Sequence, residues 1–202
     1  MKITNIKQIK NKDLIVFDLD GTLAPTKSTI DSEMNKLMED LLTVKKVAVI
    51  GGGKLELFQY QFLDHLKLSE NLLLNLFLFP TTATTFLRRE NGKWQTVYAH
   101  NLTEQEIENI MTALDQTLKE IDYQKPEKTY GETIENRGSQ VTWSALGQDV
   151  VKELGQEGID LKNKWRDENK ELKLKIGKLL QEKLPDLEVH VAGHTSIDIT
   201  KK

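Results

Sequence analysis

Apolar runs alternate with helical periodicity along the first part of the chain. Three runs are suited to buried strands, at residues 14–17, 47–50 and 72–79. Segments 32–42 and 55–66 instead repeat apolar residues at helical spacing. Strand-like runs that are apolar throughout and alternate with helices are typical of parallel strands in an α/β fold. The order strand, helix, strand, helix, strand predicts the start of a doubly wound sheet.

The pattern changes after residue 80, where hairpin, helix and strand signals are mixed. In chain order they are a hairpin around Asn91-Gly92, a helix opening at a capping box of Thr103 and Glu106, an extended stretch at 129–144, a charged helix at 161–184, and two strand-like pieces at 187–191 and 195–199. Asn-Gly between two strand-like runs is a strong hairpin signal, and a capping box marks a helix start. This order predicts a separate α+β domain inserted after the third strand.

Composition narrows the class of protein. The chain has 202 residues, of which 38% are hydrophobic and 29% charged, which fits one large or two small globular domains. A formal net charge of −3 gives no reason to expect binding to nucleic acid or to a membrane surface. The absence of cysteine excludes disulfides and thiolate zinc sites, and no signal-peptide pattern opens the chain. We therefore expect a cytoplasmic location.

Candidate chemistry lies at the end of the first strand-like run, where Asp18 and Asp20 are two residues apart. Ligands of open α/β sheets bind at the carboxyl ends of strands. There Asp18 is suited to attack phosphorus, while Asp20 protonates the leaving oxygen and then activates the second nucleophile. Gly21 allows a close turn, and Thr22 offers a hydroxyl and an amide to phosphate oxygens. Two adjacent carboxylates beside a phosphate imply a hard cation, and we expect Mg²⁺ held by Asp18 and Asp20.

The same residues have a simpler interpretation as a polar turn after a strand, because Asp and Gly are common turn formers. A lone Asp-Gly pair would favour that interpretation. The complete string from Asp18 to Thr22 behind an apolar strand favours a phosphoryl-transfer site instead.

The segment Val16-Phe17-Asp18-Leu19-Asp20-Gly21-Thr22-Leu23 resembles motif I of the haloacid dehalogenase superfamily. The resemblance implies that Asp18 is the nucleophile and Asp20 the acid/base. It extends to the branch with a large α/β cap, which includes eukaryotic-type phosphomannomutases and sugar-phosphate phosphatases. It implies a Rossmann-like core at residues 1–81 and an α+β cap domain at 82–202.

Three cap residues and one core residue match substrate contacts of that branch. By this resemblance Arg137 would bind a distal phosphate, Ser196 and Asp198 would contact sugar hydroxyls or phosphate, and Lys27 stands where the branch has an arginine near the substrate. The residues alone also allow a simpler interpretation of the three cap residues. Arg137 would then be a solvated strand arginine, and Ser196 with Asp198 the polar face of an amphipathic strand.

The sequence departs from the family at the end of the second strand, where motif II has a serine or threonine. Here the position reads Gly51-Gly52-Gly53-Lys54. The backbone amides of the glycines or the Lys54 ammonium are candidates to bind phosphate in place of that hydroxyl. A bare glycine run is also consistent with a simple turn between strand and helix. The four histidines show no metal-ligand spacing.

Two further departures concern the cap and the C-terminus. Gln148 replaces a second cap arginine of phosphomannomutases, which would weaken binding of a second phosphate. Family members also return to the core after the strand of Asp198, whereas this sequence stops at Lys202. We therefore expect an apparently incomplete core of about three strands, with an exposed edge that invites pairing, and a possible homodimer.

Together these features predict a Mg²⁺-dependent phosphatase that acts through an aspartyl-phosphate on a small phosphorylated sugar. A phosphomannomutase-type sugar phosphomutase is the second interpretation. A noncatalytic remnant that binds phosphate or a partner is the third.

Overall fold

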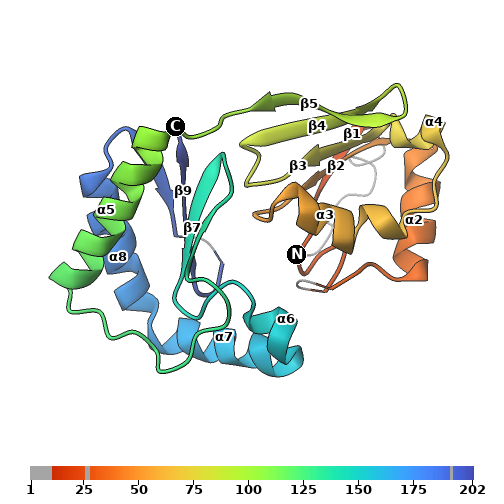
Figure 1. Ribbon diagram of the computed structural model, residues 1–202. Coiled ribbons are helices and arrows are strands. Elements are labelled where there is room, and N and C mark those ends of the chain that lie inside the picture. The colour runs from red at the N-terminus through yellow and green to blue at the C-terminus, as the bar shows by residue number, and fades with distance from the viewer. Residues whose placement is uncertain (1–10, 26–27, 192) are drawn as a thin grey trace. The chain divides into compact units, whose positions relative to one another are not determined.

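The computed structural model describes residues 11–25, 28–191 and 193–202, and the chain divides into two compact units between Ala99 and His100 (Figure 1). We call the part up to Ala99 unit 1 and the part from His100 unit 2. Within the described ranges, no helix combines the length and the apolar character needed to cross a membrane.

Unit 1 is built on a mixed five-stranded sheet with the strand order β1-β2-β3-β4-β5. The strands are β1 (Leu14–Asp18), β2 (Lys46–Ile50), β3 (Leu76–Phe79), β4 (Thr85–Glu90) and β5 (Lys93–Ala99). The first three are parallel, and β4 and β5 are antiparallel to their neighbours. The carboxyl ends of β1, β2 and β3 consequently lie along one edge of the sheet, which is where the sequence predicts the site.

The helices of unit 1 pack on one face of this sheet. They are α2 (Ser32–Leu42), α3 (Leu55–Gln61) and α4 (Glu70–Leu73), with a 3₁₀ turn η1 (Leu63–His65). Met38 of α2 and Phe58 of α3 share a single core with Val47, Val49 and other strand residues. Both crossovers proceed in the same direction along the strand order and place their helices on one face, as in one half of the predicted doubly wound sheet.

The hairpin of β4 and β5 extends the first sheet instead of joining the second domain. Phe77 pairs with Arg88 and Leu78 with Leu87, so β4 continues the sheet beyond β3. Asn91 and Gly92 both adopt positive φ, as the predicted two-residue turn requires. The described sheet thus has five strands where the sequence led us to expect about three, and the compact units divide after Ala99 where we expected a boundary at residue 81.

The opposite face of the unit 1 sheet carries apolar side chains with less cover. Leu14 and Val16 of β1 are 46% and 59% exposed, respectively. Phe86 stacks on Phe79, with ring centroids 4.6 Å apart. β1 also stands at the end of the described strand order. The homodimer remains a prediction.

Unit 2 contains a four-stranded antiparallel sheet with the order β6-β7-β9-β8. Its elements are α5 (Glu104–Glu120), β6 (Ile134–Asn136), β7 (Gln140–Ser144), α6 (Val150–Leu154), α7 (Gln156–Glu168), α8 (Lys170–Lys183), β8 (Leu187–His190) and β9 (Ser196–Lys201). The capping box of Thr103 and Glu106 opens α5 as predicted. The α/β character expected for the core and the α+β character expected for the second part are both present.

Side chains of opposite character line the two faces of the unit 2 sheet. Val141, Trp143, Ile197 and Ile199 alternate along β7 and β9 and pack, fully or almost fully buried, in one core with residues of α5 and α8. The intervening residues of the same strands are polar. This alternation is the period-2 pattern of a sheet with one face packed on helices.

The long charged helix expected at 161–184 consists of two helices. α7 ends at Glu168 and α8 begins at Lys170, and Asn169 between them has φ −122° and ψ 20°. The Asn169 side chain donates a hydrogen bond to the carbonyl of Trp165. Asparagine competes with helical backbone bonds in this way, which explains a break that helical periodicity alone does not reveal.

Candidate functional site

Asp18 and Asp20 lie on either side of a buried residue at the end of β1. Leu19 is 1% exposed, and its backbone amide donates both to Asp18 Oδ1 at 2.9 Å and to the carbonyl of Ile50 at 3.0 Å. Anchoring Leu19 in the core leaves Asp18 exposed and Asp20 half-buried. The two carboxylates predicted to share the chemistry are thus held at the same strand end.

A tight turn follows the two aspartates. Gly21 has φ 78°, a conformation that favours glycine, and its amide donates to the carbonyl of Ala24 at 2.7 Å. Thr22 is exposed, and its amide contacts the carbonyl of Leu19 at 3.4 Å. The backbone conformation of Gly21 therefore agrees with the close turn predicted at this residue. Lys27, the fifth candidate of this segment, lies outside the described residues.

The local environment raises the pKa of the Asp18 carboxyl. Partial burial is the largest cause, and the nearby charge of Asp20 acts in the same direction, while the hydrogen bond from the Leu19 amide opposes both. Asp18 consequently holds its proton to a higher pH than an ordinary aspartate. A cation beside Asp18 and Asp20 would favour the ionised form that a nucleophile requires.

The glycine run after β2 lies next to the β3 strand end. The amide of Gly51 donates to the carbonyl of Phe79, while the amides of Thr82 and Thr81 donate to the carbonyls of Gly51 and Gly53, each at 2.9 Å. These bonds tie the loops at the ends of β2 and β3 together. Lys54 directly precedes α3, so the candidate phosphate-binding segment 51–54 runs from the strand end into a helix start.

The turn after β3 is backbone-strained. Thr81, Thr82 and Ala83 have φ values of 50°, 57° and 64°, a region that non-glycine residues, and β-branched ones above all, rarely adopt. The Thr84 hydroxyl donates to the carbonyl of Thr81 at 2.6 Å and braces the turn. Strained segments cluster at functional sites. Sequence analysis did not identify this turn, because three left-handed residues without glycine leave no pattern in the sequence.

Gln61 is a site residue that the sequence analysis missed. Its side chain is fully buried at the end of α3, and Nε2 donates to Asp20 Oδ1 at 2.9 Å and to the carbonyl of Ser28 at 3.0 Å. Because Nε2 donates to both acceptors, these two bonds fix the orientation of the Gln61 side-chain amide. The Oε1 atom of the same amide is buried without a hydrogen-bond partner. A buried, polar glutamine on a helix face otherwise occupied by apolar residues was the available signal.

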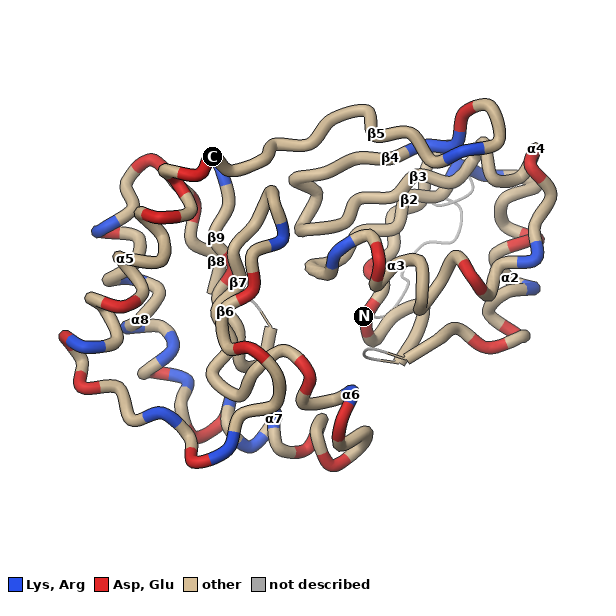
Figure 2. The backbone as a smooth tube through the Cα atoms, in the orientation of Figure 1, with Lys and Arg blue, Asp and Glu red and all other residues tan. Residues whose placement is uncertain are grey.

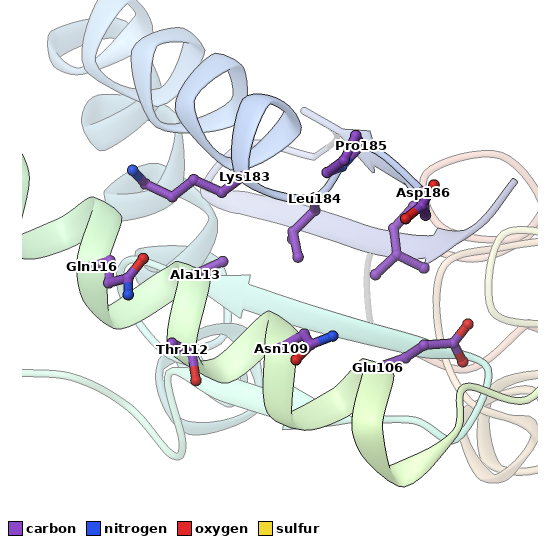
Figure 3. Close-up of a pocket in the computed structure, with 10 residues that line it drawn as sticks. Glu106, Asn109, Thr112, Ala113, Gln116, Lys183, Leu184, Pro185 and Asp186 are labelled. Carbon is purple, nitrogen blue, oxygen red and sulfur yellow. The ribbon is translucent and has the colours of Figure 1, made fainter.

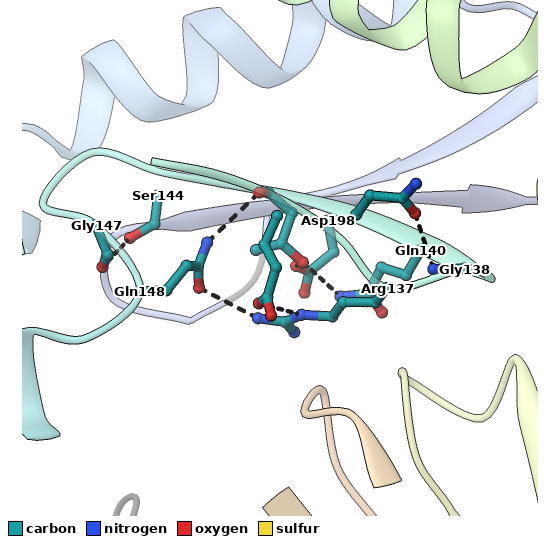
Figure 4. Close-up of polar contacts among 10 residues, drawn as sticks. Arg137, Gly138, Gln140, Ser144, Gly147, Gln148 and Asp198 are labelled. Atoms are coloured by element: carbon teal, nitrogen blue, oxygen red, sulfur yellow. Dashed lines mark hydrogen bonds and ion pairs between the residues drawn. The ribbon is translucent and has the colours of Figure 1, made fainter. Parts of the chain in front are cut away.

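The candidate residues of unit 2 lie on the polar face of its sheet. Arg137 Nε donates to Glu135 Oε2 at 2.8 Å, and Arg137 Nη2 donates to Gln148 Oε1 at 3.2 Å (Figure 4). Asp198 is 6% exposed and accepts a hydrogen bond from the Thr142 hydroxyl at 2.8 Å. Burial raises the pKa of Asp198, and this bond opposes the shift, as does the charge of Arg137.

Strand register places Ser196 on the same face as Asp198. Ser196 pairs with Ser144, and Asp198 with Thr142, so the alternation predicted from the sequence is present in β9. Arg137 is neither a solvated surface residue nor independent of its neighbours, since its side chain is only 12% exposed and ion-paired. The roles of Arg137, Ser196 and Asp198 in substrate binding remain predictions.

The donors at Asp18 and Asp20 suit a hard cation. Within the described part of the chain, no three aspartate, glutamate or histidine side chains gather in a way that would hold a metal on their own. Mg²⁺ commonly binds through one or two carboxylates and completes its coordination with water and substrate phosphate. Two adjacent carboxylates at a strand end therefore fit this ion.

A pocket of about 380 Å³ lies elsewhere in unit 2, between α5 and the turn from α8 to β8 (Figure 3). It contains none of the predicted site residues. Two of its charged residues are already paired, Glu106 with Lys201 at 3.3 Å and Lys183 with Glu120 at 2.8 Å.

Figure 2 shows both signs of charge along α5, α7 and α8, in keeping with the low net charge.

Three proteins named as phosphomannomutases are related to this chain over most of its length. A probable phosphomannomutase of Caenorhabditis elegans is 27% identical over 202 residues, covering 94% of this chain and 72% of that protein. The phosphomannomutases of Encephalitozoon cuniculi and Saccharomyces cerevisiae are each 24% identical, over 95% and 94% of this chain and 70% of their own lengths.

Solved structures agree with the fold. The C-terminal domain of a trehalose-6-phosphate phosphatase of Candida albicans matches 94% of this chain with a TM-score of 0.57 and 18% identity. An IMP-nucleotidase of Plasmodium falciparum matches 93% with a TM-score of 0.60 and 12% identity. This chain spans 57% and 52% of those chains, about half of their length, and at these identities the likeness concerns the fold alone.

The family itself follows from a match that covers nearly the whole chain. Residues 15–202 match the haloacid dehalogenase-like hydrolases. The match begins within β1, includes the two aspartates and continues through the last strand of unit 2. The chain belongs to the haloacid dehalogenase-like hydrolase family.

Proposed function

We propose that this chain is a Mg²⁺-dependent phosphatase that acts on a small phosphorylated sugar through an aspartyl-phosphate. The observation that carries the proposal is the pair Asp18 and Asp20 at one strand end, with Asp18 exposed and Asp20 fixed by Gln61. Membership of the haloacid dehalogenase-like hydrolase family supports phosphoryl transfer. The relatives named phosphomannomutases support a phosphorylated sugar as the substrate.

Each carboxylate has a distinct part in the proposed reaction. An Asp18 oxygen attacks phosphorus, the bond from phosphorus to the ester oxygen breaks, and Asp20 gives its proton to that oxygen. In the second half, water attacks phosphorus, Asp20 takes the proton of the water, and the bond to Asp18 breaks to release phosphate. Bound Mg²⁺ supplies positive charge that offsets the charge of the phosphoryl oxygens.

The neighbouring residues position the phosphoryl group. Gly21 and Thr22 directly follow the aspartates, and segment 51–54 follows β2, which pairs with β1. Because the Gly51 amide donates to the carbonyl of Phe79, the amides of Gly52 and Gly53 and the Lys54 ammonium are the groups that replace the missing hydroxyl of motif II. Lys27 is a further candidate contact. In unit 2, Arg137, Ser196 and Asp198 recognise the organic part of the substrate.

A sugar phosphomutase is the second candidate, because the relatives that match most of the chain are named phosphomannomutases. A mutase must hold a second phosphate away from the nucleophile. The pairing of Arg137 with Glu135 at 2.8 Å disfavours this, since it leaves the guanidinium charge compensated. We therefore place hydrolysis first.

Phosphate release tests the proposal directly. The purified chain is incubated with a panel of sugar monophosphates over a series of Mg²⁺ concentrations, with EDTA as the comparison. We expect release that rises with Mg²⁺ and stops with EDTA. Release that is insensitive to EDTA would contradict the metal requirement, and no release from any substrate would favour the noncatalytic alternative.

Replacing Gln61 by Leu should lower turnover by about tenfold, because Asp20 would lose the hydrogen bond that holds it in place for proton transfer. Gln59→Leu is the matched control, since Gln59 lies on the same helix but is exposed and contacts Asp64. Steady-state kinetics and thermal unfolding of both variants check this. Equal turnover in the two variants would show that Gln61 only supports the fold.

A further inference from the structure

The glycine loop, residues 51–53, has no side chains that could fix its own conformation. Glycine adopts many backbone conformations, so three in a row do not by themselves hold a backbone amide in one direction. Packing favours glycine at the first position, because a Cβ at Gly51 would lie 3.2 Å from the ring of Phe58. Amides of this loop that bind a phosphoryl group therefore need support from another part of the chain.

The turn at residues 81–84, which we call turn 81–84, provides such support. Its Thr82 amide donates to the Gly51 carbonyl and its Thr81 amide to the Gly53 carbonyl, each at 2.9 Å. A connection between two strands needs only bonds across itself, such as the bond from the Thr84 amide to the Thr81 carbonyl at 3.1 Å. The bonds to the glycine loop are additional, so the turn does more than join β3 to β4.

These two bonds determine the direction of two further amides. In a planar trans peptide, the carbonyl of one residue and the N–H of the next point in opposite directions, and every peptide bond in the described ranges is trans. The Gly51 carbonyl points to the turn after β3, so the Gly52 N–H points toward β1, because β2 lies between β1 and β3. The Lys54 N–H likewise points away from the turn, since the Gly53 carbonyl points to Thr81.

The end of β1 is where Asp18 and Asp20 stand. Asp18 pairs with Ile50 in the ladder of β1 and β2, and the Leu19 amide donates to the Ile50 carbonyl at 3.0 Å. Neighbouring strands lie about 4.8 Å apart, so the Gly52 amide is directed into the space beside the proposed nucleophile. An N–H group aimed there stabilises negative charge on a phosphoryl oxygen.

Turn 81–84 keeps its unfavourable conformation because several bonds hold it. Residues 81–83 are all left-handed without a glycine among them. The Thr84 hydroxyl donates to the Thr81 carbonyl at 2.6 Å, and the Tyr98 hydroxyl donates to the Ala83 carbonyl at 3.1 Å. Strained backbone persists only where its surroundings over-determine it, so loss of one bond should let the turn relax. The two glycine carbonyls would then lose their fixed partners.

We propose that turn 81–84 is a positioning element for phosphoryl binding, which holds the carbonyls of Gly51 and Gly53 and thereby aims the amides of Gly52 and Lys54 at the phosphoryl group. The turn acts through the glycine loop and does not itself contact the substrate. All the groups involved belong to unit 1. The inference rests on the proposed phosphatase function for the reaction, whereas phosphate binding can be measured without turnover.

Thr84→Val tests the inference, because it removes the hydroxyl bond to Thr81 and keeps the shape of the side chain. Turnover of a small aryl phosphate by the full chain with Mg²⁺ is measured, together with its inhibition by inorganic phosphate and by orthovanadate. Both inhibition constants should rise by about tenfold in Thr84→Val, and kcat/KM should fall by about tenfold. Thr84→Ser keeps the hydroxyl and should stay within about twofold of the unsubstituted chain.

Thr43→Val is the matched control for this substitution. The Thr43 hydroxyl also donates to a carbonyl three residues earlier at 2.6 Å, in this case that of Asp40. Thr43 follows α2 and precedes the start of β2, so it lies away from the strand ends that carry the proposed site. The inhibition constants and kcat/KM of this variant should equal those of the unsubstituted chain.

Backbone amide NMR gives a direct measurement without turnover. Inorganic phosphate with Mg²⁺ should shift the amide proton resonances of Gly52 and Lys54 in the unsubstituted chain, and Thr84→Val should need about tenfold more phosphate for the same shift. Thr82→Asn keeps the backbone bond to Gly51 and replaces a β-branched residue by one that tolerates left-handed φ. It should raise the thermal unfolding temperature and leave phosphate affinity unchanged.

Several results would overturn the inference. They are the absence of phosphate-dependent shifts at Gly52 and Lys54, unchanged inhibition constants in Thr84→Val, and equal losses in Thr84→Val and Thr43→Val or in Thr84→Val and Thr84→Ser. A tenfold loss of affinity in Thr82→Asn would assign the role to the Thr82 side chain instead. If Thr84→Val fails to fold, the shifts in the unsubstituted chain and in Thr82→Asn still decide. Absence of phosphate release from the unsubstituted chain counts against the phosphatase function alone, because the amide shifts still report phosphate binding.

Discussion

Replacing Asp18 by Asn should abolish phosphate release from every substrate, with a loss in kcat on the order of 10⁴-fold or more. The carboxylate of Asp18 is the proposed nucleophile at the end of β1, and an amide is both a poor nucleophile and a poor ligand for a hard cation. The substitution keeps the size of the side chain and its capacity to accept the hydrogen bond from the Leu19 amide. The loss should therefore occur without a large change in thermal stability.

Asp13→Asn is the matched control for this substitution. Asp13 is exposed and directly precedes β1, so the same chemical change is made outside the proposed site. Its turnover should equal that of the unsubstituted chain. Acid-quenched protein incubated with a labelled phosphate ester should retain label in the control and none in Asp18→Asn. Undiminished turnover in Asp18→Asn would refute the nucleophile assignment.

Replacing Asp20 by Asn should have the second-largest effect, and the effect should depend on the leaving group. A sugar alkoxide needs a proton as it leaves, so turnover of sugar phosphates should fall by roughly 10²–10⁴-fold. An aryl phosphate leaves without that help. With an aryl phosphate, Asp20→Asn should therefore release the phenol in a rapid burst and then turn over slowly, because the second step still requires a base to activate water.

Rapid-quench measurement of the burst separates this role from a structural one. A burst amplitude close to one equivalent per chain would show that Asp18 still attacks while the second step is impaired. A general disruption of the site would instead slow aryl and sugar phosphates by the same factor. Equal losses for the two substrates would thus remove Asp20 from the acid/base role.

The contiguous parts of the candidate site were predictable from the sequence. Asp18, Asp20 and Gly21 lie within one short string, and the turn that brings them together is local. The same holds for the Asn91-Gly92 hairpin turn and for the capping box at Thr103. In each case the physical cause acts between near neighbours in the chain, so a short pattern is sufficient.

Contacts between distant segments were not predictable in this way. Gln61 is 41 residues from Asp20, and its burial depends on how α3 packs against the sheet. The placement of the hairpin depends on the pairing of β4 with β3, which extends the first sheet and which hydrophobic pattern alone does not specify. The break at Asn169 arose from a competing side-chain hydrogen bond within a stretch of helical periodicity.

The sequence by itself determined the class of fold, most of its helices and strands, and the two aspartates, because periodicity, caps and a contiguous motif are local properties. Only the tertiary structure decided that helices cover one face of the first sheet, that Gln61 holds Asp20, and that Glu135 and Gln148 engage Arg137. Gln148 is 11 residues from Arg137 in sequence, and the strength of the pair between Glu135 of β6 and Arg137 just after it depends on how deeply the two side chains are buried. Charge compensation at the sheet face is for this reason a property of the folded chain, although every residue that takes part in it can be read in the sequence.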